Sequence, residues 1–152
     1  MKKLFALILT VCLLAAMATT AFAANTAGGE ADITTSIAPT YTVTIPADVN
    51  VQFNATETAF GAIEVTASQI HPDKCIKVAL ATDKELNNAI DNTKVIPYAI
   101  KDSTGAAFTS ATYLTEGDKT ELSIHITADD WNAAYAGEYS DTVTFTITYE
   151  DK

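Results

Sequence analysis

The stretch that decides the fold is Tyr139-Ser140-Asp141-Thr142-Val143-Thr144-Phe145-Thr146-Ile147-Thr148-Tyr149, close to the end of the 152-residue chain. Every odd-numbered position of this stretch except Asp141 carries an apolar or aromatic side chain, and every even-numbered position carries a serine or a threonine. Because successive side chains of a β-strand point to opposite faces, this period of two predicts one long strand. Its core-facing side is expected to carry Tyr139, Asp141, Val143, Phe145, Ile147 and Tyr149.

The same alternation recurs through the rest of the chain. Alternating runs lie at residues 41–45, 49–53, 63–65, 75–80, 96–100 and 122–126, and a weaker run lies at residues 32–37. Pro46 ends the first run because proline has no N–H to donate to a strand ladder, and Pro97 restricts its run to an edge strand or a bulge. Seven or eight short strands predict an all-β fold, an antiparallel β-sandwich.

Turn residues separate these strands and leave little room for helix. The turn signals lie at residues 46–50, 71–73, 102–105, 116–118 and 136–137. Residues 84–90 are typical of either one turn of helix or a polar loop, and residues 128–132 predict a short helical turn before the last strand.

Residues 1–23 have the pattern of a cleavable signal peptide. Lys2 and Lys3 precede an apolar run, and Ala21-Phe22-Ala23 supplies small residues at the positions before the cut. The apolar run of about 15 residues is shorter than the roughly 20 that a membrane-spanning helix needs. We therefore expect a secreted protein at the extracellular surface, with residues 24–30 as a flexible leader and residues 31–152 as one domain.

The charge of the chain restricts its possible partners, and its cysteine content restricts its possible disulfides. Nine basic residues against 19 acidic residues give a formal net charge of −10, and every basic residue is lysine. A chain without arginine or a basic patch is a poor match for nucleic acid or anionic lipid. Cys75 is the only thiol that remains after residue 23, so no intramolecular disulfide can form.

Two segments resemble strands of known secreted domains. Residues 136–149, which begin Ala-Gly-Glu-Tyr-Ser-Asp, resemble the closing strand of spore coat protein U-like and chaperone–usher pilin-like domains. Residues 41–46 resemble the opening strand of small secreted immunoglobulin-like surface domains of bacteria. The resemblance implies an immunoglobulin-like β-sandwich and a fibre-forming role. The disulfide that is frequent in the pilin-like domains is impossible here.

The chain offers few groups for chemistry. The two histidines, His71 and His125, have no second His or Cys at ligand spacing, so no zinc site is predicted. Cys75 has no cation fixed beside it in the sequence and is interpreted as a half-buried structural thiol. A Ser-His-Asp triad lacks the Gly-rich loop and the sharp turn that would support it.

Acidic and aromatic residues gather before the last strand. The four carboxylates are interpreted as a solvated acidic rim rather than a calcium site, because they lack the Asp-x-Asp rhythm of calcium loops. Three aromatics are interpreted as a core plug and corner rather than a platform for stacking a ligand. The carboxylates are Asp129, Asp130, Glu138 and Asp141, and the aromatics are Trp131, Tyr135 and Tyr139.

These observations predict no catalytic, cofactor-binding or metal-binding residue. The favoured hypothesis is a non-enzymatic cell-surface module for adhesion or assembly, with itself or another surface protein as partner. The alternative is a small carbohydrate- or calcium-binding module that uses Tyr113, Trp131 and Tyr135, and a hydrolase is a distant third. Residues 32–37 are expected to join their own domain, and exchange of this strand between copies is the competing hypothesis.

Overall fold

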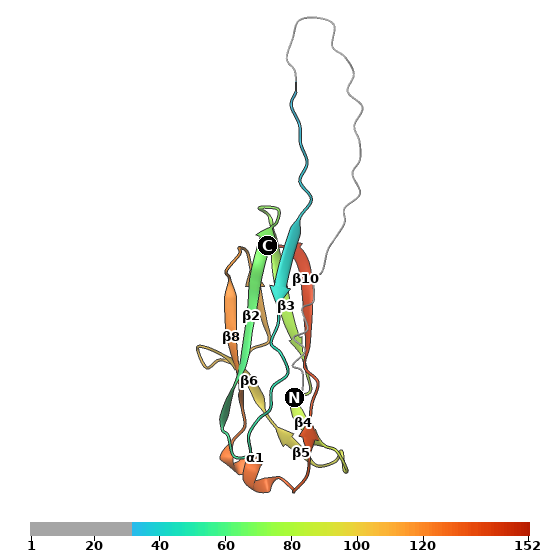
Figure 1. Ribbon diagram of the computed structural model, residues 1–152, viewed down its shortest axis with the longest axis vertical. Coiled ribbons are helices and arrows are strands. Elements are labelled where there is room, and N and C mark those ends of the chain that lie inside the picture. Colours follow the sequence, from blue (N-terminus) through green and yellow to red (C-terminus); the bar gives the residue numbers. More distant parts are fainter. Residues whose placement is uncertain (1–31) are drawn as a thin grey trace, which may run out of the picture.

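The computed structural model describes residues 32–152. The expected signal peptide and leader lie outside the described residues. The described chain is nearly all β, and its strands form three antiparallel sheets (Figure 1). The prediction of an all-β antiparallel fold is therefore confirmed.

Two larger sheets provide the framework. The four-stranded sheet has the order β1 (Thr40–Thr44), β2 (Glu57–Gln69), β8 (Lys119–His125) and β6 (Ala99–Asp102). The second sheet has the order β10 (Thr144–Asp151), β3 (Lys74–Ala81) and β7 (Ser110–Tyr113). A small third sheet contains β5 (Val95–Pro97), β4 (Glu85–Asn88) and β9 (Tyr139–Ser140), and the one described helix is α1 (Ala128–Ala133).

The core lies between the two larger sheets. Ile63 and Val65 of β2 are fully buried, and they belong to the same cluster as Ile76 and Val78 of β3. Burying one such side chain stabilises the fold by about 1.5 to 3 kcal/mol relative to leaving it exposed. Because the buried residues recur at every second position, the period-two pattern in the sequence corresponds to the inward face of each strand.

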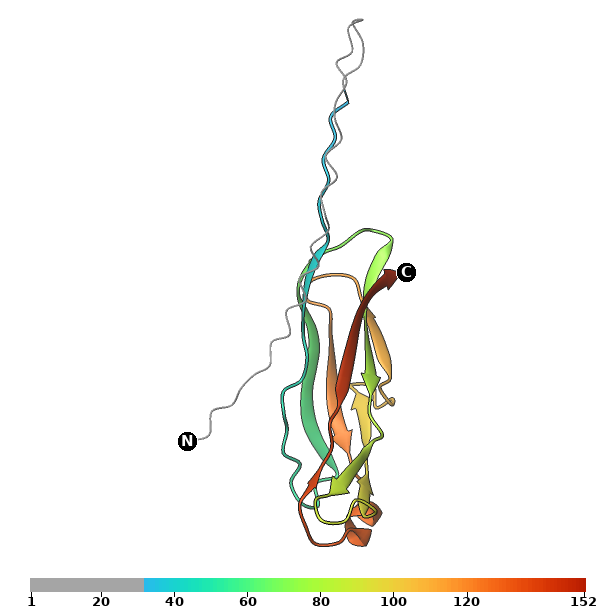
Figure 2. The same ribbon diagram turned by 90° about the vertical axis from the view of Figure 1, so that its right-hand side faces the viewer.

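The molecule is elongated and has two distinct ends (Figures 1 and 2). One end, which we name the helix pole, contains α1, residues 53–55 and the loop of residues 89–94 between β4 and β5. The opposite end, the tether pole, contains residues 70–73 and the loop of residues 114–118. Residues 32–39, which we name the tether, leave the sheets at the tether pole and extend away from them.

Several local expectations are confirmed. The short helix before the last strand is α1, which begins after Thr127. The run around Pro97 forms two edge strands, because β5 ends one sheet and β6 ends another. The turn at residues 102–105 is closed by a hydrogen bond from the N–H of Gly105 to the carbonyl of Asp102.

Four expectations are wrong. The last strand is interrupted at residues 141–143, so β9 pairs with β4 whereas β10 pairs with β3. Residues 85–88 form β4, neither a helical turn nor a polar loop. Residues 49–53 and residues 32–37 form no strand, since neither segment pairs with a neighbour.

Candidate functional site

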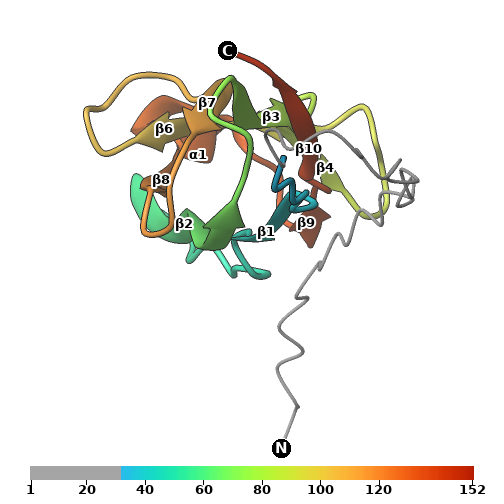
Figure 3. The same ribbon diagram turned by 90° about the horizontal axis from the view of Figure 1, so that it is seen from above.

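Two strands at one side of the molecule have an open edge. β1 is the terminal strand of its sheet and pairs with β2, and β10 is the terminal strand of its sheet and pairs with β3. Seen along the long axis, β1 and β10 lie on the same side of the molecule (Figure 3). Within residues 32–152, no ladder joins them. Unpaired edges of this kind are templates for the addition of another strand.

Below these strands, towards the helix pole, lies a groove of about 1500 Å³ that is lined in part by the small third sheet. One wall is formed by residues 45–53, which follow β1, and the other wall by residues 139–145. The floor is mostly apolar and is formed by Phe60, Leu86, Ile96, Tyr98 and Ile124. The groove is therefore a place where an extended segment with apolar side chains could lie.

The first wall leaves its sheet because of its sequence. Pro46 follows β1 and cannot donate to a ladder. The neighbouring strand β2 has a register shift between Ala59 and Gly61, and Gly61 has a positive φ of 116°. A Cβ built on Gly61 would lie 3.5 Å from Pro46 Cβ, which is an ordinary van der Waals contact, so it is the positive φ that favours glycine here.

A cluster of hydroxyl groups around Asp141 determines the second wall. Thr82 Oγ1 donates to Asp141 Oδ2 at 2.8 Å, and the hydroxyl of Tyr98 donates to the same oxygen. Thr82 Oγ1 also accepts the N–H of Lys84 at 2.9 Å. These bonds hold the last strand at the point where it leaves β4 and before it joins β3.

Tyr98 is suited to the role of donor in this cluster. Its side chain is 8% exposed. Burial, and secondly its hydrogen bond to Asp141, raise the pKa of Tyr98 far above its ordinary value of 10.0. The phenol therefore keeps its proton throughout the physiological range and remains a donor to the carboxylate.

Two aromatic rings lie in contact beyond the groove, on the side of the tether pole. Tyr41 of β1 and Tyr149 of β10 have ring centroids 5.8 Å apart. The hydroxyl of Tyr149 accepts the N–H of His71 at 2.9 Å. Burial and the neighbouring Tyr149 raise the pKa of Tyr41. Side-chain contact thus joins β1 and β10 at this end, where backbone pairing does not.

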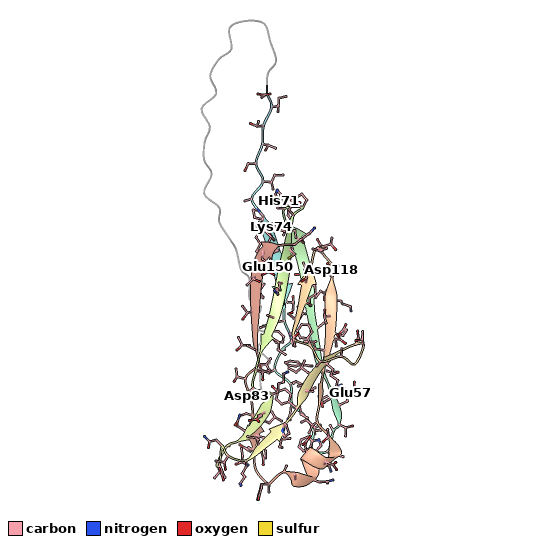
Figure 4. All side chains as sticks on the ribbon, turned by 180° about the vertical axis from the view of Figure 1, so that it is seen from behind. Glu57, His71, Lys74, Asp83, Asp118 and Glu150 are labelled. Atoms are coloured by element: carbon pink, nitrogen blue, oxygen red, sulfur yellow. The ribbon has the colours of Figure 1, made fainter. Side chains whose placement is uncertain are left out.

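Two ion pairs join β3 to β10 near this aromatic contact. Lys74 Nζ lies 2.6 Å from Asp151 Oδ1, and Lys77 Nζ lies 3.1 Å from Glu150 Oε1. Lys74, Glu150, His71 and Asp118 all lie towards the tether pole, whereas Asp83 and Glu57 lie nearer the helix pole (Figure 4).

At the helix pole the groove reaches four aromatic side chains. Trp131 Nε1 donates to the carbonyl of Ala55 at 2.9 Å, and the exposed ring of Phe53 packs edge-on against Trp131 at 5.6 Å. Tyr135 is 64% exposed, with Lys94 Nζ 5.0 Å from its ring centre. The hydroxyl of Tyr139 donates to the carbonyl of Tyr135 at 3.0 Å, so the expected tyrosine corner is present.

The structure separates the three aromatics of the alternative hypothesis. Tyr113 is 2% exposed on β7 and its hydroxyl donates to Thr120 Oγ1, so it is a core residue and cannot contact a ligand. Trp131 is half-buried, and Tyr135 is the one exposed ring of the three. The platform of the alternative hypothesis is therefore not formed by these three residues. The exposure of Tyr135 also departs from the core plug that was expected of Trp131, Tyr135 and Tyr139.

The expected acidic rim is also divided. Asp141 is half-buried and accepts hydrogen bonds, as described above, whereas Asp130 accepts the hydroxyl of Thr127, the residue that caps α1. Over residues 32–152, no group of three or more His, Cys, Asp or Glu side chains is arranged to hold a metal ion.

The nearest arrangement to a hydrolase triad lies on the outer face of the four-stranded sheet. Ser123 Oγ is 2.9 Å from His125 Nε2, and Glu57 Oε1 is 3.9 Å from that same nitrogen. A catalytic triad needs the acid at the opposite ring nitrogen, so these three side chains do not have triad geometry.

The cysteine is more deeply buried than expected. Cys75 is 3% exposed, and its thiol faces the carbonyls of Glu150 and Asp151.

The tether exposes side chains that are normally buried. Ile33 is 99% exposed and Ile37 is 69% exposed. The segment extends away from both larger sheets (Figures 1 and 2). Isoleucine is among the residues most often buried in folded proteins, so two isoleucines exposed to water are unusual.

The groove was not predicted from the sequence, because its walls are irregular segments with strand-like alternation. Thr82 and Tyr98 were also missed. The one local sequence signal for the groove is Pro46, because a proline after a strand interrupts its pairing.

None of the helices in the described part of the chain is long and apolar enough to cross a membrane. Comparisons with protein-family models, curated proteins and solved structures found no match.

Proposed function

We propose that this protein is a non-enzymatic, secreted cell-surface module for adhesion or assembly, and that its copies join by strand addition. In this proposal the domain is an immunoglobulin-like β-sandwich that lacks one edge strand. Residues 32–37 of a second copy supply that strand in the groove. The pattern of residues 1–23 supports secretion.

The observation that carries the proposal is an apolar groove next to two open strand edges, together with an exposed tether. The groove has an apolar floor and the tether has unburied isoleucines. In an extended segment, Ile33, Thr35 and Ile37 lie on one face, because strand side chains alternate. Six residues of strand span about 20 Å. Burial of each isoleucine would contribute about 1.5 to 3 kcal/mol.

The backbone at the junction favours a second copy over the tether's own groove. To fold back beside its own β1, the tether would have to reverse direction within Ala38 and Pro39. Two-residue hairpin turns need a positive φ at their first central residue, which alanine disfavours. The contact between Tyr41 and Tyr149 also lies between the base of the tether and the open part of the groove.

The test compares two forms of the mature protein, one beginning at Ala24 and one beginning at Ala38. We expect the longer form to give a ladder in unheated detergent gels and growing assemblies by light scattering. The shorter form should be a folded monomer by circular dichroism. A single monomeric species for both forms at high concentration would refute strand addition.

A peptide of residues 24–37 tests the groove directly. We expect it to bind the shorter form and to raise its melting temperature, because a ligand that binds only the folded state stabilises it. The matched control is the same peptide with Ile33→Asp and Ile37→Asp, which places charge on the face that would be buried. Equal binding of the two peptides would show that the isoleucines do not occupy an apolar groove.

A further inference from the structure

We infer that consecutive copies also meet end to end, with the helix pole of one copy packed against the tether pole of the next. This inference rests on the proposed strand addition. It adds a second contact, which is made by the folded domains themselves.

The first observation is the location of exposed apolar side chains. Of the large hydrophobic residues exposed in residues 32–152, two lie on the tether and one, Val49, lies on the groove wall. The other four lie at the poles: Phe53, Ile90 and Tyr135 at the helix pole, and Leu114 at the tether pole. Phe53 and Tyr135 also line the groove, whereas Ile90 and Leu114 lie outside it. The three side chains gathered at the helix pole mark an interaction surface.

The second observation is the length of the chain between the tether strand and β1. Only Ala38 and Pro39 separate Ile37 from Thr40, where β1 begins. A residue spans at most about 3.6 Å, so this link reaches about 10 Å. Once the tether lies in the groove of one copy, the tether pole of its own domain must therefore touch the end of the groove from which the link leaves.

The third observation identifies that end. The contact between Tyr41 and Tyr149 lies between the groove and the tether pole, whereas the groove itself extends to Trp131 and Tyr135 at the helix pole. A link that leaves through the open end emerges at the helix pole. The tether then runs antiparallel to the second wall of the groove, residues 139–145, and antiparallel pairing is slightly more stable than parallel pairing.

The proposed end-to-end contact joins two different surfaces. The helix pole offers Phe53, Ile90 and Tyr135, and the tether pole offers Leu114. Because two different surfaces meet, the contact repeats from copy to copy and generates an open chain instead of a closed pair.

The test places a charge at each pole of the mature protein. Ile90→Asp and Leu114→Asp lie outside the groove and are 93% and 42% exposed in the wild type, so both variants should fold. We expect each to raise the protein concentration needed for half-assembly by about tenfold, as the loss of one buried apolar contact predicts. The control Ser103→Asp adds the same charge to an exposed loop away from both poles and should leave this concentration unchanged.

A second measurement separates this inference from the proposed function. Binding of the peptide of residues 24–37 to the form that begins at Ala38 involves no pole contact, so neither substitution should change its affinity. Unchanged assembly of both variants, or a closed dimer by light scattering, would overturn the end-to-end contact while strand addition stands. No binding of the peptide to the wild-type domain would overturn both.

Discussion

At the scale of single residues, Asp141 holds the most informative contacts. Its carboxylate accepts hydrogen bonds from Thr82 and Tyr98, two residues far away in the sequence. We predict that Asp141→Ala lowers the free energy of unfolding by about 1 to 3 kcal/mol, because it removes the acceptor that two partly buried hydroxyl groups share. The control Glu116→Ala removes an exposed loop carboxylate and should change stability by less than about 0.5 kcal/mol.

Urea unfolding measures both variants. Equal midpoints for Asp141→Ala and Glu116→Ala would mean that the cluster does not stabilise the kink in the last strand. Tyr98→Phe removes one donor and keeps the ring, so it should have a smaller effect than Asp141→Ala.

A second residue-scale prediction concerns acid stability. Asp118 accepts the N–H groups of Leu114 and Thr115 at 2.8 and 2.9 Å, and these bonds lower its pKa below the ordinary 3.8. Hydrogen bonds from threonine side chains and backbone lower the pKa of Asp91 and Asp102 in the same way. A carboxyl whose pKa is lower in the folded state gives full stabilisation above its unfolded pKa and loses it as pH falls through the folded pKa.

We therefore expect the urea midpoint to decrease as the pH is lowered from about 5 to about 2.5. Asp118→Asn cannot titrate at this position, so its midpoint should decrease less steeply over that range. Parallel curves for the two proteins would show that Asp118 does not contribute to acid sensitivity.

At the scale of elements, the junction between β4 and β9 depends on one glycine. Gly137 has a φ of 153°, and a Cβ there would lie 2.5 Å from Asn88 Nδ2. Asn88 cannot move freely, because its Oδ1 accepts the N–H groups of Ile90 and Asp91. We predict that Gly137→Ala destabilises the domain by about 1 to 3 kcal/mol.

A double variant separates the two causes of that loss. Asn88→Ala removes the side chain that the new Cβ would meet, so adding Gly137→Ala to it should have a smaller effect than adding Gly137→Ala to the wild type. An equal loss in both backgrounds would assign the whole effect to the backbone conformation. Urea unfolding of the four proteins gives the comparison.

The sequence predicted regular elements better than irregular ones. The alternation of Phe145, Ile147 and Tyr149 with threonines does correspond to half-buried and exposed faces of β10. The same alternation at Val49 and Val51 misled, because an apolar groove wall and a strand share one pattern. Conversely, Leu86 lies in a mostly polar run, and its strand depends on neighbours at Ile96 that no local pattern reveals.

The candidate site was harder to predict than the fold, for the same reason. Thr82, Tyr98 and Asp141 come together only when three strand ends meet in the folded chain. No spacing in the sequence identifies hydroxyl groups that will form such a cluster. The tether could be identified from its low apolar content, but its displacement from the sheets follows from the absence of cross-strand partners.

At the scale of the whole molecule, charge opposes assembly. The chain has 19 acidic residues against nine basic ones, so copies that approach one another repel. The contacts proposed between copies are apolar and would not be weakened by salt. We therefore predict that raising ionic strength from about 0.01 M to about 0.15 M, which shortens the screening length from about 30 to about 8 Å, promotes assembly.

Light scattering of the mature protein across this salt series gives the concentration of half-assembly at each point. We expect that concentration to fall as salt increases, and we expect the form beginning at Ala38 to remain monomeric throughout. A rise with salt would mean that ion pairs, such as those available to Lys94 or Lys152 at the two poles, hold the copies together. In that case apolar contacts at Ile90 and Leu114 could not be the main attraction between the folded domains.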